Sequence, residues 1–357
     1  MTANISTATT DTTVQLAALR SRYIDLLRDA LTMSLWHAAD GNQMQNVFGA
    51  SASELREDGR DWPQLAHTMI GRKRMNNLQF CVEDVLSRGI PGDFIETGVW
   101  RGGACIFMRG ILEAYGITDR KVWVADSFQG LPPADVDKYP IDGEGVPFHI
   151  FPQLAISQET VENNFRSYGL LDDQVVMLKG FFRDSLPTAP VGQLAILRLD
   201  GDMYESTIDA LNSLYSKLSD GGYVIVDDFC IEGCRQAIHD FRTEHGITDV
   251  MHVVDWTGVY WRKGSGDAGN GAPTSFEELS ATYDQLFSAY VELRNQHLAG
   301  VSTIAQLRVD NATANAALAA SGAQVVVPQP PSTLPGLAKA EVRRAARKAR
   351  DIVRKLR

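Results

Sequence analysis

The sequence predicts an α/β fold: a doubly wound, mostly parallel sheet of the Rossmann-like class, with helices on both of its faces. Six apolar stretches rich in Val, Ile and Leu lie between residues 92 and 256, and helical stretches separate them. Two of these stretches end on acids, "LAILRLDGD" at Asp200 and Asp202 and "GYVIVDD" at Asp227 and Asp228. Polar residues are expected there because open α/β sheets bind ligands beyond the carboxyl ends of their strands.

The elements follow from local pattern. Strands are expected at residues 92–98, 121–127, 174–180, 194–200, 222–228 and 251–256. Helices are expected between them at 103–116, 157–169, 206–219 and 234–246, and before them at 14–36 and 75–89, where apolar residues recur at helical spacing. We therefore expect a disordered, Thr-rich start (1–15), a helical region (16–90) and an α/β domain (91–263).

Beyond residue 263 the composition changes. Residues 264–275 have the Gly-rich composition of a linker, and 276–320 carry apolar residues at heptad spacing. This pattern fits a single long helix docked on its own domain or a coiled-coil arm that makes the chain a homo-oligomer. A Pro-rich linker (321–336) precedes a basic amphipathic tail (337–357), which is either a solvated terminus or a peripheral contact with an anionic membrane surface.

Charge and cysteine content limit the class of protein. The net charge is −10, and because the tail 337–357 carries +7, the remainder carries −17. Such a chain repels a phosphate polymer, so no nucleic-acid partner is expected. Four scattered cysteines favour a reducing cytoplasm, and no secretion signal or apolar run of about 18 residues is present. A cytoplasmic location is expected, peripheral to the inner face of the membrane if the tail binds there.

The first strand-to-helix turn, "ETGVWRGGA", indicates a nucleoside site without a phosphate. Glu96 stands where the dinucleotide fingerprint has its first glycine, and Gly98 is followed by Gly102 rather than by a glycine three residues on. An acid at that place repels a pyrophosphate and attracts a cation. The next strand ends on Asp126, which suits the two hydroxyls of a ribose. Together they point to S-adenosylmethionine; the alternative is that the glycines only let the helix approach the sheet.

The acids of the later strands predict a metal site. Three unneutralised carboxylates at one edge would cost on the order of several kcal/mol, because buried charges lose their hydration and like charges repel each other. A Mg²⁺ ion removes this cost, takes oxygen ligands and leaves positions for a substrate hydroxyl. We therefore assign Asp200, Asp227 and Asp228 to Mg²⁺. Asp202 is assigned a structural role instead, as a cap of the helix that follows.

Eight segments in order also resemble one known family. They are "AHTMIG", "GDFIETGVWRGGA", "VADSFQGLP", "NNFRSYGLLDDQV", "LKGFFRDSLP", "LRLDGDMYEST", "GGYVIVDDF" and "VDWTGVYWRK". Together they resemble the macrocin O-methyltransferases (TylF type), antibiotic-tailoring enzymes that methylate sugar hydroxyls, over roughly residues 22–263. The resemblance implies a class I methyltransferase fold, S-adenosylmethionine as donor, Mg²⁺ dependence and N-terminal helices that form a lid over the site.

The resemblance also implies roles for individual residues. Asp200 would be both metal ligand and general base, with Asp227 and Asp228 completing the metal site. Related catechol-type enzymes use a lysine three positions after the first metal Asp as base, but Met203 stands there in this chain. The base role therefore falls to Asp200 or to a metal-bound hydroxide. The residues expected to bind S-adenosylmethionine are Thr68, Met69, Glu96, Thr97, Gly98, Trp100, Asp126, Ser127, Ser157, Gly180 and Phe181. His149, Trp256 and Tyr260 are candidates for the acceptor site.

The resulting hypothesis is an O-methyltransferase that acts on a sugar hydroxyl of a glycosylated natural product or glycan. The acceptor is therefore expected to be a small molecule or a glycan. Two alternatives stay open: a methyltransferase for a phenolic hydroxyl, and a catalytically silent module for glycan binding or assembly.

Overall fold

The computed structural model describes residues 4–36, 52–144 and 146–264. The chain divides into two compact units, and every described residue belongs to the first, Met1–Met44 with Ser51–Ser280. The second unit, Gln45–Ala50 with Ala281–Arg357, lies outside the described residues. The predicted linkers after Gly264, the heptad helix and the basic tail also lie outside them and stay predictions.

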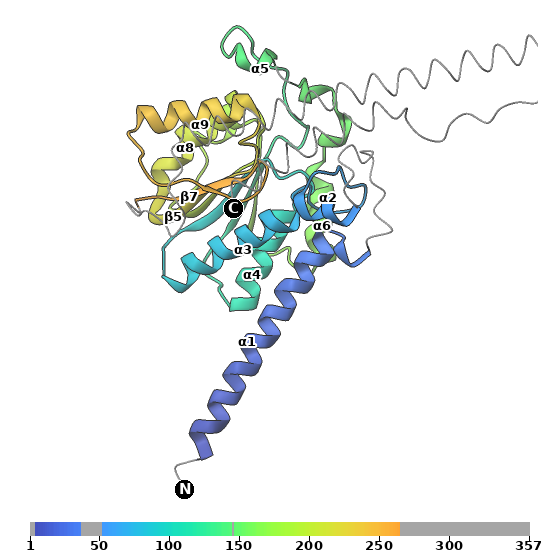
Figure 1. Ribbon diagram of the computed structural model, residues 1–357, viewed down its shortest axis with the longest axis vertical. Helices are drawn as coiled ribbons and strands as arrows, with labels where there is room; N and C mark the ends of the chain where they lie inside the picture. The colour runs from blue at the N-terminus through green and yellow to red at the C-terminus, as the bar shows by residue number, and fades with distance from the viewer. Residues whose placement is uncertain (1–3, 37–51, 145, 265–357) are drawn as a thin grey trace, which may run out of the picture. The chain divides into compact units, whose positions relative to one another are not determined.

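A sheet forms the centre of the described unit (Figure 1). It has seven strands in the order β3-β2-β1-β4-β5-β7-β6. The strands are β1 (Asp93–Thr97), β2 (Val122–Asp126), β3 (Val175–Lys179), β4 (Leu194–Leu199), β5 (Leu218–Val226), β6 (His252–Val253) and β7 (Val259–Arg262). The first five pair in parallel, and β7 runs antiparallel to β5 and β6. The predicted fold class is confirmed. Chain order reverses between β1 and β4, where such sheets bind ligands.

The register brings three strand ends level. Thr97 of β1 pairs with Leu199 of β4, and Leu199 pairs with the last residue of β5. The backbone N–H of Asp200 donates to the carbonyl of Thr97 at 2.9 Å, and that of Asp227 donates to Leu199 at 2.9 Å. The residues that follow β1, β4 and β5 therefore meet at one edge of the sheet.

Helices cover both faces of the sheet, α3 and α4 on one and α8 and α9 on the other (Figure 1). The α-helices are α1 (Asn4–Leu31), α2 (Ala52–Asp58), α3 (Arg72–Ser87), α4 (Gly103–Tyr115), α5 (Ile141–Glu144), α6 (Gln158–Ser167), α7 (Phe182–Ser185), α8 (Tyr204–Leu214) and α9 (Glu232–Glu244). The described residues also form 3-10 turns: η1 (Ser34–Trp36), η2 (Phe148–Ile150), η3 (Pro152–Leu154) and η4 (Tyr215–Lys217). Side chains from α1, α3, α4 and the sheet share one apolar core.

Helix α4 is buried along its first ten residues because it is covered on several sides. A Cβ added to Gly110 would lie 2.2 Å from Cδ2 of Leu27, so α1 packs closely against α4 at this glycine. Helix α4 is capped at its C-terminus by Gly116, whose left-handed conformation lets its N–H donate to the carbonyl of Glu113 at 3.0 Å. The helix that follows the first strand is therefore packed against α1 at its middle and capped at its C-terminal end.

The main differences from the sequence predictions concern α1, β7 and β6. Helix α1 begins at Asn4, so residues 4–15, predicted to be disordered, are helical; the apolar pattern that starts near Val14 nucleates a helix that extends backward. Residues 259–262 form β7, which was not predicted, because its alternating burial lacks the continuous apolar run of a parallel strand. The predicted strand 251–256 shortens to two residues, since Asp255 Oδ1 accepts the N–H of Thr257 and turns the chain.

Two findings bear on the predicted compartment. All four cysteines lie among the described residues, and each is a buried free thiol whose pKa is raised by burial. No disulfide framework exists, as predicted. Among the helices of the described ranges, none is both long and apolar enough to cross a membrane. The cytoplasmic location itself stays a prediction.

Candidate active site

The glycine turn, residues 97–103, leads from β1 into α4 and leaves no room for side chains at its glycines. Gly98 adopts φ 91°, and a Cβ there would lie 1.7 Å from the backbone oxygen of Asp200. A Cβ on Gly103 would lie 2.4 Å from the carbonyl of His67. The turn is therefore pressed between the end of β4 and the segment that precedes α3. Only glycine permits either approach.

Asp126 joins this turn to the end of β2. Its carboxylate accepts the backbone N–H of Val99 at 2.8 Å and that of Phe128 at 2.7 Å. Burial raises the pKa of Asp126, and these backbone donors oppose the rise. The backbone N–H of Gly180, after β3, donates to the Asp126 carbonyl at 2.9 Å. The first three strand ends are thus tied together around one acid.

The acidic edge, which we define as Asp200, Asp227 and Asp228, lies at the ends of β4 and β5. One carboxylate oxygen from each of the three lies within 4.8 Å of one from each of the others. Burial and repulsion from Asp202 and Asp200 raise the pKa of Asp228, and burial also raises that of Asp227. Three oxygens converging at this separation suit a hard divalent cation. The structure thus brings together the three carboxylates that the sequence predicted to meet.

Asp202 is also part of this region. Its backbone N–H donates to the Asp228 carboxylate at 3.1 Å, and it adopts φ 62°, which is uncommon for a residue other than glycine. Burial, followed by repulsion from Asp200, raises the pKa of Asp202 to about 8. The predicted capping role is wrong: α8 begins at Tyr204, and the residue in the N-cap position is Met203.

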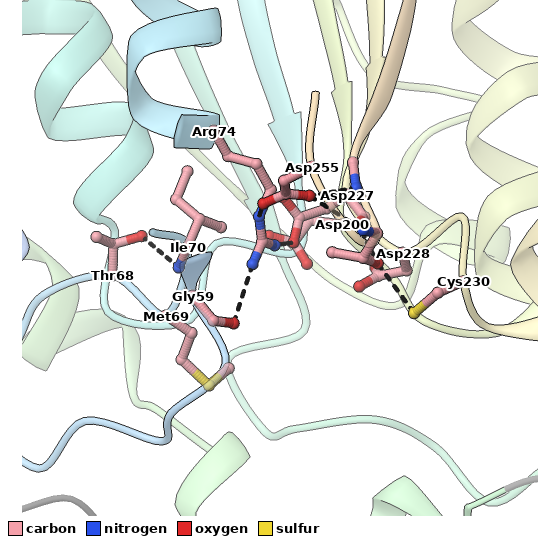
Figure 2. A network of polar contacts seen from close by, with 12 residues as sticks. Gly59, Thr68, Met69, Ile70, Arg74, Asp200, Asp227, Asp228, Cys230 and Asp255 are labelled. Carbon is pink, nitrogen blue, oxygen red and sulfur yellow. Dashed lines mark hydrogen bonds and ion pairs between the residues drawn. The ribbon is translucent and has the colours of Figure 1, made fainter. Parts of the chain in front are cut away.

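Two buried arginines neutralise part of this acid. Arg198, 1% exposed, lies in β4 and contacts Glu96, Asp200 at 2.6 Å, and Asp227. Arg74, 8% exposed, reaches in from α3 to Asp227 and to Asp255 at 3.0 Å (Figure 2). Burial alone would lower the pKa of each guanidinium, but the carboxylates outweigh it, so both pKa values are raised.

Neither arginine was predicted from the sequence to belong to the site. Arg198 had a signal: in a strand, residues two apart share a face, so a charge two positions before Asp200 must lie beside it. The assumption that only a metal could neutralise the acids was therefore incomplete. Arg74 had no comparable signal, because "GRKRMNN" contains three basic residues and nothing local tells which one turns inward.

The residues predicted to bind the donor do not all lie together. Gly98, Asp126, Ser127 and Gly180 meet at the strand ends, and Ser127 Oγ donates to the carbonyl of Gly130 at 2.7 Å. Ser157 lies on the surface, where its Oγ accepts the backbone N–H of Thr160 at 3.2 Å as the cap of α6.

Two of the predicted donor residues point into the protein. Both oxygens of Glu96 are engaged, one by Arg198 and the other by Cys105 Sγ at 2.9 Å, and burial raises the pKa of Glu96 to about 7. Thr97 Oγ1 is buried and lies 3.4 Å from the carbonyl of Arg198. Their predicted contact with a cofactor stays a prediction, and the structure gives them contacts within the protein.

The remaining predicted donor residues come from three separate segments. Trp100 adopts φ 46° and donates its indole N–H to the carbonyl of Gln153 at 2.9 Å. Thr68 is buried and Met69 half-buried in the segment before α3, and Phe181 is half-buried at the start of α7. Of the acceptor candidates, His149 is exposed, Trp256 donates to the carbonyl of Asp58 at 2.8 Å, and Tyr260 stacks on His252.

A sheet in this strand order is that of the class I methyltransferases, and the site at its switch point fits their donor. The glycines of the turn after β1 admit no side chains, and an acid after β2 can accept the two hydroxyls of a ribose. These features define an S-adenosylmethionine-dependent methyltransferase of class I.

The comparisons with known proteins then specify the family. The family model described as Macrocin-O-methyltransferase (TylF) matches residues 20–263, and the chain belongs to this family. It is 51% identical to the mycinamicin III 3''-O-methyltransferase of Micromonospora griseorubida over 244 residues, 68% of this chain and 96% of that protein. It is also 51% identical to a tetracenomycin-C 4'-O-methyltransferase of Streptomyces olivaceus over 243 residues, 68% of this chain and 93% of that protein.

A solved structure agrees with this assignment. The O-methyltransferase NovP is 49% identical, covers 68% of this chain and 99% of its own, and superposes with a TM-score of 0.65. The predicted family and enzyme class are confirmed: the chain is an S-adenosylmethionine-dependent O-methyltransferase.

Proposed function

We propose that the protein is a Mg²⁺-dependent enzyme that methylates a sugar hydroxyl of a glycosylated natural product or glycan. Relatives that are 51% identical are named for methylation at a 3'' position of mycinamicin III and at a 4' position of a rhamnosyl-tetracenomycin. The observation that carries the proposal is the contact between Gly98 and Asp200. The turn proposed for the methyl donor therefore lies directly against the backbone oxygen of Asp200, a residue of the acidic edge.

Asp200 is the proposed general base. Its side chain is 27% exposed, whereas that of Asp227 is 6% exposed, so Asp200 is the more accessible to an acceptor. Arg198 holds one of its oxygens at 2.6 Å. The other oxygen would then serve both as a ligand of the proposed metal and as the acceptor of the hydroxyl proton as the methyl group is transferred.

The acidic edge is the proposed metal site. Asp200, Asp227 and Asp228 supply oxygen ligands only, which is the donor set that Mg²⁺ prefers. When bound, the ion supplies Lewis-acid polarisation that lowers the pKa of the acceptor hydroxyl. The chain's own part is to hold these carboxylates apart and oriented, which Arg74 and Arg198 do through their contacts with Asp227.

The donor site is proposed at the glycine turn. Asp126 would accept the ribose hydroxyls, with Ser127, Gly180 and Phe181 toward the adenine end. Thr68 and Met69 would close over the methionine end; a Cβ on Gly103 would lie 2.7 Å from Cβ of Thr68, so this segment touches the start of α4. S-adenosylmethionine, when bound, supplies the electrophilic methyl group.

An acceptor screen with labelled S-adenosylmethionine tests the proposal. Glycosides that carry free sugar hydroxyls should become labelled, and the label should fall when a chelator removes divalent cations. Labelling of catechols alone would favour the phenolic alternative. If S-adenosylhomocysteine fails to bind in calorimetry, the catalytically silent module becomes the better description.

Replacing Asp200 by Asn should reduce turnover by at least about a hundredfold, the range typical for a lost general base. An amide neither accepts the proton nor coordinates a cation well, but it leaves the glycine turn unchanged, so affinity for S-adenosylhomocysteine should stay near that of the wild type. Asp220→Asn is the control, because that side chain is 86% exposed and lies near the start of β5, away from the acidic edge. Equal turnover in both variants would remove Asp200 from the mechanism.

Two proposals concern residues outside the described ranges. We propose that residues 276–320 make the chain a homo-oligomer and that the basic tail, 337–357, binds anionic membrane surfaces. Analytical ultracentrifugation of the full chain tests the first, and a monomer would refute it. Sedimentation with anionic vesicles, before and after removal of the tail, tests the second.

A further inference from the structure

We propose that Arg74 is a positioning residue that fastens the segment 52–71 onto the carboxylates at the acidic edge and thereby holds Thr68 and Met69 at the donor site. Replacing Arg74, or replacing its partner Asp255, should therefore weaken donor binding. The inference rests on the proposed donor site, because Thr68 and Met69 matter for donor binding only if they belong to that site.

Arg74 contacts two parts of the protein that are far apart in sequence (Figure 2). Toward the sheet, its guanidinium binds Asp227, and its Nε donates to Asp255 at 3.0 Å. Toward the N-terminal region, its Nη2 donates to the carbonyl of Gly59 at 3.2 Å. One buried cation therefore joins the end of α2 to the end of β5.

The backbone at Gly59 is shaped for this contact. Gly59 adopts φ 60°, and a Cβ there would lie 2.4 Å from Nη2 of Arg74 and 2.4 Å from the backbone N of Gly71. A Cβ on Gly71 would in turn lie 2.3 Å from the carbonyl of Glu57. The turn after α2 is thus packed on the residue that precedes α3, and Arg74 lies directly beneath this junction.

The same junction leads to the donor site. Arg56, in α2, is buried and donates to the carbonyl of Met69 at 2.6 Å and to that of Thr68 at 3.5 Å. The carbonyl of His67 accepts the N–H of Gly103, in the glycine turn, at 2.9 Å. The contacts therefore run without a gap from Asp227 through Arg74 and the segment 52–71 to the start of α4.

A second contact shows that the loop after β6 is part of this support. Trp256 donates its indole N–H to the carbonyl of Asp58 at 2.8 Å. Gly258 lies against the Arg74 stem, with its added Cβ 3.1 Å from Cγ. Asp255, whose side chain is 1% exposed, holds this loop by accepting the N–H of Gly258 at 2.8 Å.

The ion pairs are strong enough to matter. Breaking a buried pair by removing one partner leaves an uncompensated buried charge and is strongly destabilising, whereas water already solvates the charges of an exposed pair, which therefore contributes little. Lys73, the preceding residue of α3, pairs with Asp58 at 2.6 Å, and its own side chain is 42% exposed. Arg74 and Lys73 therefore reach the same turn but differ in burial, which decides how strongly each pair holds the turn.

The test combines hydrogen exchange with binding of S-adenosylhomocysteine, both in the full-length protein without turnover. In Arg74→Met we expect amides of residues 55–60 and 66–71 to exchange at least tenfold faster, and affinity for S-adenosylhomocysteine to fall about tenfold, a loss of about 1.4 kcal/mol. Exchange in β4 should stay within about twofold of wild type, since the effect is local. Arg74→Lys keeps the charge and should recover part of the loss.

Asp255→Asn alters a partner of Arg74 and leaves Arg74 itself unchanged. The new amide keeps an oxygen for the loop and presents N–H groups to the guanidinium, so Arg74 is displaced without being altered. Faster exchange in the segment 52–71 is expected here too, although Asp255 lies outside that segment. This variant also carries the test if Arg74→Met fails to fold.

Lys73→Met is the matched control and should behave as the wild type. The inference is overturned if Arg74→Met and Asp255→Asn match this control in exchange and affinity. It is also overturned if exchange accelerates equally throughout the sheet, which would show a general loss of stability, or if exchange accelerates with donor affinity unchanged. None of these measurements involves an acceptor or methyl transfer, so an error in the proposed function would not alter them.

Discussion

At the scale of single residues, Gly98 places the strictest limit on the chain. Its backbone conformation favours glycine, and its Cα faces the backbone oxygen of Asp200 with no space between them. Backbone atoms on both sides cannot move aside as a flexible side chain can. Gly98 therefore permits both the turn after β1 and the close approach of the Asp200 backbone after β4.

Gly98→Ala should lower the free energy of unfolding by at least about 3 kcal/mol, in the upper part of the range for single substitutions. The added methyl group meets the oxygen of Asp200 and must displace it. Affinity for S-adenosylhomocysteine should fall with stability. Urea unfolding and calorimetry provide the two measurements.

Gly116→Ala separates strain from collision. Gly116 has φ 66° but no atom within 4 Å of an added Cβ, so it bears only the conformational cost of about 1–2 kcal/mol. Equal losses in the two variants would show that the contact with Asp200 adds nothing.

The sequence predicted the acids of the site better than the groups around them. Asp200, Asp227 and Asp228 follow strands whose ends meet in any parallel sheet, so the pattern alone brings them together. The partners of these acids come from distant segments whose packing no local pattern records. Glu96 illustrates the limit: its position in the turn was evident, but its burial against Arg198 and Cys105 was not.

At the scale of elements, β4 has an unusual composition for a central strand. Its six residues are all buried, and one of them is Arg198. The arginine is tolerated there because its guanidinium bridges acids of β1 and of the ends of β4 and β5. A charge in the middle of the sheet thus acts as a tie between three strands.

Arg198→Met should lower the free energy of unfolding by about 3–5 kcal/mol, because it leaves several buried carboxylates without a counter-charge. Adding Glu96→Gln to this variant should restore part of the loss, since one of those charges disappears. Arg88→Met is the control: its pair with Asp84 is on the surface and contributes about 1 kcal/mol or less. Urea titration measures all three, and a loss in Arg198→Met no larger than the control would contradict the bridging role.

Elements with a regular apolar pattern were predicted well, and those defined by their neighbours were not. The five parallel strands and α4 carry continuous apolar runs that identify them. Strand β7 exists because β5 offers it an edge in the antiparallel sense, with Val226 opposite Val259, and no feature of four alternating residues reveals that edge. The early start of α1 likewise depends on extension of a helix that begins in a stronger segment.

At the scale of the molecule, the described unit contains a complete sheet, its covering helices and the whole proposed site. The last strand, β7, ends at Arg262, and the family match ends at residue 263. A chain of residues 1–264 should therefore unfold in one cooperative transition with the midpoint of the full protein, and should bind S-adenosylhomocysteine equally well. Calorimetry on both chains checks this expectation. Loss of binding in the shorter chain would show that residues beyond 264 complete the site.

The burial of every native thiol makes the enzyme convenient for spectroscopy. Reagents that modify cysteine are electrophiles that react with the thiolate, and all four thiols are shielded from solvent with pKa values raised by burial. A single new cysteine in place of the exposed Ser53, on α2, would consequently take up a fluorophore selectively, with no native cysteine removed. Changes in emission would then report how α2, which contacts Thr68 and Met69 through Arg56, responds as the cofactor arrives and leaves.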